Sequence, residues 1–116
     1  MGNSERAIAR LGARSNRTMN HDAVIRVRLL TRAEGGRTIP VSGKHFGCPL
    51  IIDDEYFDCR LILMDMELQL GLSYDVPVVF LDAATVMPKL KIGKQLSLWE
   101  GKIIGHAKIM SVSAHN

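Results

Sequence analysis

The chain has 116 residues, of which 47% are hydrophobic and 23% are charged. This is enough for one domain of ordinary soluble composition, and too little for a catalytic domain beside a separate binding domain. No apolar run reaches the roughly 18 residues of a membrane span, and the first residues lack the apolar centre of a secretory signal, so we expect a cytoplasmic protein without a membrane partner. The formal net charge is +3, and the first twenty residues account for it.

Residues 1–20, MGNSERAIARLGARSNRTMN, form a polar, basic segment with few large apolar side chains. We expect a disordered tail when this segment is alone. A helix induced on a polyanion would align its arginines along one stripe, where they could follow phosphates. A merely solvated tail is the alternative, because no aromatic residue is present to stack on bases. The arginines are Arg6, Arg10, Arg14 and Arg17.

From residue 22 onward the pattern is that of strands. In DAVIRVRLLT, apolar residues recur at every second position, as in a half-buried strand. In CRLILMDMELQL the same period predicts that Asp65, Glu67 and Gln69 face outward. The residues predicted to face inward are Ile62, Met64, Met66, Leu68 and Leu70. Further strands are expected near residues 37–42, 47–53, 76–81, 94–99 and 102–112. Residues 21–116 are therefore predicted to form one all-β domain, a barrel or a sandwich.

The stretch TRAEGGRTIP predicts a tight connection between the first strand and the next. Gly35 and Gly36 suit such a corner because glycine adopts positive φ at little steric cost. Glu34 and Arg37 flank the corner closely enough to pair across it, in an exposed ion pair worth at most about 1 kcal/mol.

The EGGR turn, followed by Pro40, resembles the start of the C-terminal β-barrel domain of the bacterial translation elongation factor Tu family. The segment SGKHFGCPL and the closing LSLWEGKIIGHAKI are also similar to that family in order and spacing. Glu100, Gly101, Lys102 and Gly105 stand at the matching positions of the closing hairpin. The closing turn has one glycine fewer than the family, Trp99 stands where a basic residue is usual, and the loop DDEYFD is more acidic.

The resemblance implies a small closed antiparallel β-barrel of about six to seven strands. It also implies a non-catalytic binding module for tRNA, other RNA or a translation-related protein. No GxxxxGK[ST] loop is present, so we expect no GTPase activity. Basic residues and the closing turn are the predicted contacts with RNA, through its phosphates; a generic solvated surface is the alternative. These residues are Arg26, Arg28, Arg37, Lys44, His45, Glu100, Gly101, Lys102, His106 and Lys108.

A protein-binding or self-associating module is the rival hypothesis, and it leaves the oligomeric state open. Tyr56, Phe57 and Trp99 are aromatic residues of the kind that anchor interfaces, although each could instead cover the end of a small barrel. The acidic residues 53–58 could attract a basic partner.

We expect neither catalysis nor a bound cofactor or metal. The histidines lack ligand spacing, and DDEYFD lacks the glycine and terminal glutamate of a calcium loop. Cys48 and Cys59 have no companion at metal-ligand spacing, so they are predicted to be reduced core residues. Either could act as a nucleophile only if the fold brings a histidine beside it.

Overall fold

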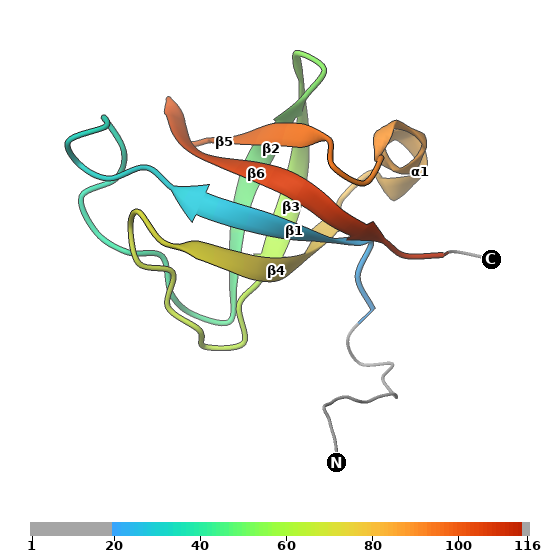
Figure 1. Ribbon diagram of the computed structural model, residues 1–116. Helices are drawn as coiled ribbons and strands as arrows, with labels where there is room; N and C mark the ends of the chain where they lie inside the picture. Colours follow the sequence, from blue (N-terminus) through green and yellow to red (C-terminus); the bar gives the residue numbers. More distant parts are fainter. Residues whose placement is uncertain (1–19, 115–116) are drawn as a thin grey trace.

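The computed structural model describes residues 20–114, which form a closed antiparallel β-barrel (Figure 1). Its strand order is β1-β4-β3-β2-β5-β6, and this confirms the predicted all-β barrel. Figure 1 shows β2 and β3 standing across the direction of the other four strands. The predicted stripe of Arg6, Arg10, Arg14 and Arg17 lies outside the described residues. The strands are β1 Ala23–Leu29, β2 His45–Ile52, β3 Glu55–Ile62, β4 Ser73–Phe80, β5 Gln95–Trp99 and β6 Ile103–Val112.

Strict alternation along the strands builds the core. β1 pairs with β4 on one side and β6 on the other, so its inward residues lie at the centre of the barrel wall. Those residues, Ala23, Ile25, Val27 and Leu29, are buried as predicted. Cys48 and Cys59 are also buried and carry free thiols, as predicted for reduced core residues.

One buried acid secures the start of β1. The Asp22 side chain is only 6% exposed, and its Oδ2 accepts a hydrogen bond of 2.8 Å from the backbone N–H of Phe80. A buried carboxylate is tolerated where hydrogen bonds satisfy it. This contact joins the first strand to the end of β4.

The predicted inward face of CRLILMDMELQL is partly wrong. β3 ends at Ile62, and the buried residues are Leu61 and Leu63, whereas Met64 is 63% exposed. Met64 and Asp65 have positive φ, and the backbone N–H groups of Leu63 and Met64 both bond to the carbonyl of Lys44. The chain therefore turns where the prediction continued a strand. The four consecutive apolar residues 61–64 do not show which of them alternate inward. Choosing the wrong pair shifts the pattern by one residue and exchanges the inward and outward faces of the strand.

After this turn, the predicted inward and outward positions of residues 65–70 agree with the structure. Leu68 is fully buried, and Met66 and Leu70 are partly buried against the core. The three residues predicted to face outward are exposed: Asp65, Glu67 and Gln69.

The strand predicted near residues 37–42 is absent. Residues 30–44 instead form a long connection whose only ladder contact is the bridge between Val41 and Leu68. The other four predicted ranges agree with β2, β4, β5 and β6.

The segment between β4 and β5 holds two short helices that the sequence analysis did not anticipate. They are α1, Ala83–Val86, and the 3₁₀ helix η2, Met87–Lys89. Asp82 caps α1 by accepting a hydrogen bond from the N–H of Thr85. Neither helix of the described part is long or apolar enough to cross a membrane.

The acidic segment DDEYFD is a hairpin tip and the start of a strand rather than one loop. Asp53 and Asp54 have φ values of 52° and 66°, the left-handed conformation that a two-residue turn of this kind requires. Residues 55–58 already belong to β3. The alternation of β3 consequently sends Tyr56 outward and Phe57 inward.

Candidate functional site

The outer surface of β3, β2 and β5 carries an apolar patch, which we call the aromatic face and define by Pro49, Ile51, Tyr56 and Trp99. The rings of Tyr56 and Trp99 meet edge to face, with centroids 5.5 Å apart and planes at 87°. Ile51 of β2 lies opposite Tyr56 on one side and Ser97 of β5 on the other. The aromatic pair thus bridges over β2. Tyr56 remains 58% exposed, whereas Trp99 is half-buried beneath it.

The structure separates the three aromatic residues that the sequence singled out. The pairing of β5 with β6 shifts register between Leu98 and Trp99. A bulge of this kind changes the direction in which the side chain after it points. Tyr56 and Trp99 come together on the outside, whereas Phe57 packs against the core under the ammonium of Lys89, whose Nζ lies 5.9 Å from the ring centroid. Two of the three therefore form a surface feature.

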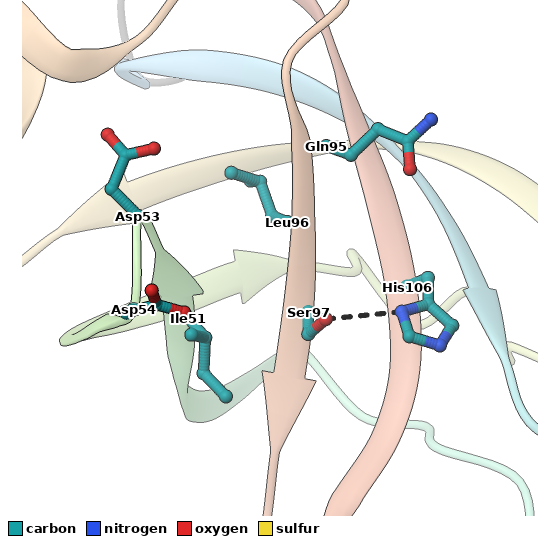
Figure 2. Close-up of a pocket in the computed structure, with 7 residues that line it drawn as sticks. All are labelled: Ile51, Asp53, Asp54, Gln95, Leu96, Ser97 and His106. Atoms are coloured by element: carbon teal, nitrogen blue, oxygen red, sulfur yellow. Dashed lines mark hydrogen bonds between the residues drawn. The ribbon is translucent and has the colours of Figure 1, made fainter.

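A hollow of about 360 Å³ adjoins the aromatic face (Figure 2). At one side, Ser97 Oγ and His106 Nδ1 lie 3.1 Å apart. At the other side is the hairpin tip, where the ammonium of Lys94 binds the carboxylate of Asp53 at 2.7 Å. The residues that line the hollow are Ile51, Asp53, Asp54, Gln95, Leu96, Ser97 and His106.

Three exposed acids lie near this surface, together with the bases Arg60 and Lys94. Asp54, Glu55 and Asp58 lie on or beside the hairpin tip and are all exposed. Within residues 20–114 their carboxylates make no hydrogen bond or ion pair, in contrast to that of Asp53. Unpaired carboxylates beside exposed aromatic rings favour a cationic partner.

The two turns that resemble the elongation factor family lie in contact, although they are far apart in the sequence. Arg37 Nη1 donates to both carboxylate oxygens of Glu100, at 2.6 and 2.9 Å. The Arg37 guanidinium also lies 5.4 Å from the centroid of the Phe46 ring. Lys102 Nζ donates to the carbonyl of Gly36 at 3.2 Å. These contacts fasten the first turn to the closing turn, in which Gly101 has a φ of 74°.

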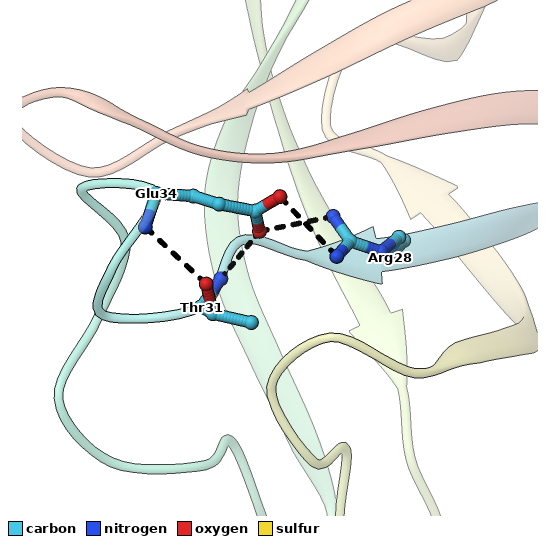
Figure 3. Close-up of polar contacts among 3 residues, drawn as sticks. All are labelled: Arg28, Thr31 and Glu34. Carbon is cyan, nitrogen blue, oxygen red and sulfur yellow. Dashed lines mark hydrogen bonds and ion pairs between the residues drawn. The ribbon is translucent and has the colours of Figure 1, made fainter.

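The predicted pair between Glu34 and Arg37 is wrong. Glu34 instead accepts two hydrogen bonds from Arg28, at 3.1 and 3.3 Å, and one of 2.8 Å from the backbone N–H of Thr31 (Figure 3). The Thr31 hydroxyl accepts in return from the N–H of Glu34. The backbone hydrogen bond from Thr31, followed by those from Arg28, lowers the pKa of Glu34. Arg28 reaches the turn from the outer side of β1, which the local sequence spacing did not reveal.

Four of the cations predicted to bind phosphate, namely Arg26, Arg28, Arg37 and Lys44, already face a carboxylate. Arg26 forms two hydrogen bonds with Asp75, at 2.7 and 3.1 Å, and these lower the pKa of Asp75. The pair therefore persists at neutral pH and is lost only in acid, as pH falls below the usual aspartate value of about 3.9. Lys44 contacts Asp65 at 3.4 Å, and His45 is exposed at the start of β2.

The outer side of β1 and β6 does bring several basic residues together. Arg26 stands opposite Lys108, and Arg28 stands opposite His106. Because Arg26 and Arg28 are each paired with an acid, this cluster carries much less free charge than the sequence implied.

Sequence reasoning missed Ile51, Gln95 and Ser97 as parts of a site. The alternation of inward and outward side chains along β2 and β5 could have predicted that Ile51 and Ser97 face outward. That β2 lies beside β5 has no local signal, because these strands are separated along the chain by two others.

A scan against protein-family models and a search of the curated proteins found no match. The resemblance to elongation factor Tu therefore stays a prediction.

The contact between the two turns predicts measurable coupling. We expect Arg37→Ala to lower the free energy of unfolding by about 1–3 kcal/mol, because it removes a charged hydrogen bond and the contact with Phe46. In a double-mutant cycle with Glu100→Ala, the coupling energy should be about 1 kcal/mol and should fall with added salt.

The pair of Arg26 and Asp75 is the matched control. Both of its side chains are 48% exposed, whereas Arg37 is only 18% exposed. Its coupling should be clearly smaller, because solvent screens an exposed ion pair. Equal coupling in the two cycles would mean that the turns are not held by this contact.

Proposed function

We propose that this protein is a non-catalytic protein-binding module that binds its partner through the aromatic face. The observation that carries the proposal is the edge-to-face pair of the exposed Tyr56 and the half-buried Trp99 beside a hollow. Tyrosine and tryptophan dominate binding energy at protein interfaces, because each covers a large area with few rotatable bonds and keeps a polar atom for the rim. The resemblance to elongation factor Tu favours a translation-related protein as the partner.

The charges favour a protein over RNA as the partner. Arg26, Arg28 and Arg37 are each bound to a carboxylate, so a phosphate would have to displace that acid or sit beside it. Over residues 20–116 acids and bases are equal in number. Domains that bind nucleic acid through phosphates are normally clearly basic.

Two potential nucleophiles lack the surroundings that catalysis requires. The Cys59 thiol donates to the carbonyl of Cys48 at 3.1 Å, and its interaction with Cys48 and its burial raise its pKa, so it stays protonated. Ser97 does contact His106, but within residues 20–114 no carboxylate contacts the other nitrogen of that ring to orient it. These features support a binding role.

A photo-crosslinking residue in place of Tyr56 tests the proposal directly. p-Benzoylphenylalanine is aromatic and fits this exposed position. In cells that make the protein, irradiation should give one discrete adduct that protease removes and ribonuclease leaves intact. Adding Trp99→Ala should weaken the adduct about tenfold or more, because hot-spot truncations cost upwards of about 2 kcal/mol.

The control places the same crosslinker at Leu72, which is 56% exposed and lies in the connection between β3 and β4. That position should give no adduct sensitive to Trp99→Ala. An adduct at position 56 that ribonuclease removes would instead identify RNA as the partner. Equal labelling at both positions, or none at position 56, would contradict the proposal.

A further inference from the structure

We infer that the aromatic face and the acidic hairpin tip bind an arginine-rich segment, and that residues 1–19 of the same chain are that segment. This inference rests on the proposed function, because it assigns an occupant to the same surface. The occupant is defined by its guanidinium groups.

The chemistry of the surface fits a guanidinium. Such a group stacks on the face of an aromatic ring and donates parallel hydrogen bonds to a carboxylate. The aromatic face offers the rings of Tyr56 and Trp99, and Asp58 points outward from β3 two residues after Tyr56. Asp54 lines the adjoining hollow. Tyr56 and Asp58 thus stand on the same outer face of β3, two residues apart.

The molecule already uses this combination once. Arg37 lies over the ring of Phe46 and donates to the carboxylate of Glu100. On the aromatic face the ring and the acids are present, but within residues 20–114 no arginine binds these acids. Arg60 is also exposed on this face of β3, two residues after Asp58, and it makes no ion pair with Asp58. The acids are therefore available to an arginine from outside the described residues.

The segment before residue 20 supplies that cation. It contains Arg6, Arg10, Arg14 and Arg17 with Glu5 as the only acid, whereas acids and bases balance in the remainder of the chain. Nineteen residues can extend over roughly 60 Å. The largest dimension of the molecule is 41 Å, so the segment is long enough to span it.

The covalent link favours the segment of the same chain over that of a second copy. A tethered segment has an effective concentration of about a millimolar, far above a typical concentration of a separate molecule. Residues 1–19 would therefore cover the aromatic face when no partner is bound. A protein partner must then displace them, so partner binding should strengthen when the arginines are removed.

Trp99 reports on this site because it is the only tryptophan of the chain. The test compares the full-length protein with a full-length variant in which Arg6, Arg10, Arg14 and Arg17 are all replaced by serine. Quenching of Trp99 fluorescence by acrylamide should be about twofold stronger in the variant, because the ring loses its cover. High salt should raise quenching in the wild type to the same level and leave the variant unchanged.

A synthetic peptide of residues 1–20 completes the test, since it contains neither tryptophan nor tyrosine. Added to the four-serine variant, it should restore the protection of Trp99. Asp54→Asn with Asp58→Asn should weaken this binding about fivefold or more. Asp65→Asn, which changes the charge in the connection between β3 and β4, is the control and should leave the binding unchanged.

Equal quenching in the wild type and the four-serine variant would overturn the inference. Protection that disappears on dilution of the wild type would also overturn it, because the occupant would then be a second copy. The crosslink from position 56 separates this outcome from failure of the proposed function. If that crosslink to a protein persists, the face binds a partner and only its occupation by residues 1–19 is wrong.

Discussion

Replacing Gly36 by alanine is expected to lower the free energy of unfolding by about 2–3 kcal/mol. A Cβ atom at this position would lie 2.3 Å from the carbonyl oxygen of Leu30 and 2.7 Å from its carbonyl carbon. These are backbone atoms at the end of the first strand, and they cannot move without displacing the turn. Displacement would also pull Arg37 away from Glu100 and the carbonyl of Gly36 away from Lys102.

Gly35→Ala is the matched control. Gly35 has a φ of 89°, but nothing lies within 4 Å of a Cβ built there. Its replacement should therefore cost only the left-handed backbone penalty, about 1 kcal/mol. Urea unfolding of the two variants measures the difference. If the losses were equal, the close approach to Leu30 would not matter, and both glycines would serve only the bend.

Leu98→Ala is expected to lower the free energy of unfolding by about 3–5 kcal/mol, the upper part of the range for a buried leucine. Leu98 has no exposed surface and belongs to the strand that closes the barrel. β5 pairs with β2 only through Leu98 with Leu50 and Ser97 with Ile51. Because this closure is short, it depends more on side-chain packing than the longer ladders do.

Ser97→Ala on the outer side of the same strand should cost no more than about 1 kcal/mol, the value of its hydrogen bond with His106. Amide hydrogen exchange locates the effect of Leu98→Ala. Exchange should accelerate in β2 and β5 at low denaturant, where local opening dominates. A uniform acceleration in all six strands would show that the closure is no weaker than the rest of the barrel.

The alternation of apolar residues was sufficient to predict β1, and the turn residues between apolar segments predicted β2, β4, β5 and β6. It failed in CRLILM, where consecutive apolar residues carry no period of two, and in residues 37–42, where apolar residues serve a connection that folds onto the core through Val41. In both places the local structure is set by backbone hydrogen bonds to residues distant in sequence. Leu63 and Met64 bond to Lys44, and Val41 bonds to Leu68.

In the EGGR turn, too, the local sequence predicted the bend, whereas the contacts of its residues depend on distant parts of the chain. Its glycines predicted a corner, and Gly35 does adopt positive φ. The role of Gly36 depends on the approach of Leu30, and the partners of Glu34 and Arg37 depend on where β1 and the closing turn lie. Local spacing suggested that these two charges pair with each other, because no other partner is visible in the sequence.

By itself, the sequence determined the all-β class, the inward face of β1, the reduced buried cysteines and the confinement of net charge to the first twenty residues. Only the tertiary structure decided that Tyr56 and Trp99 meet across β2, and that the first turn is fastened to the closing turn. The physical reason is that periodicity states which face of a strand a residue occupies, whereas the neighbour of each strand depends on how the whole sheet closes. The candidate site lies at such a junction between strands.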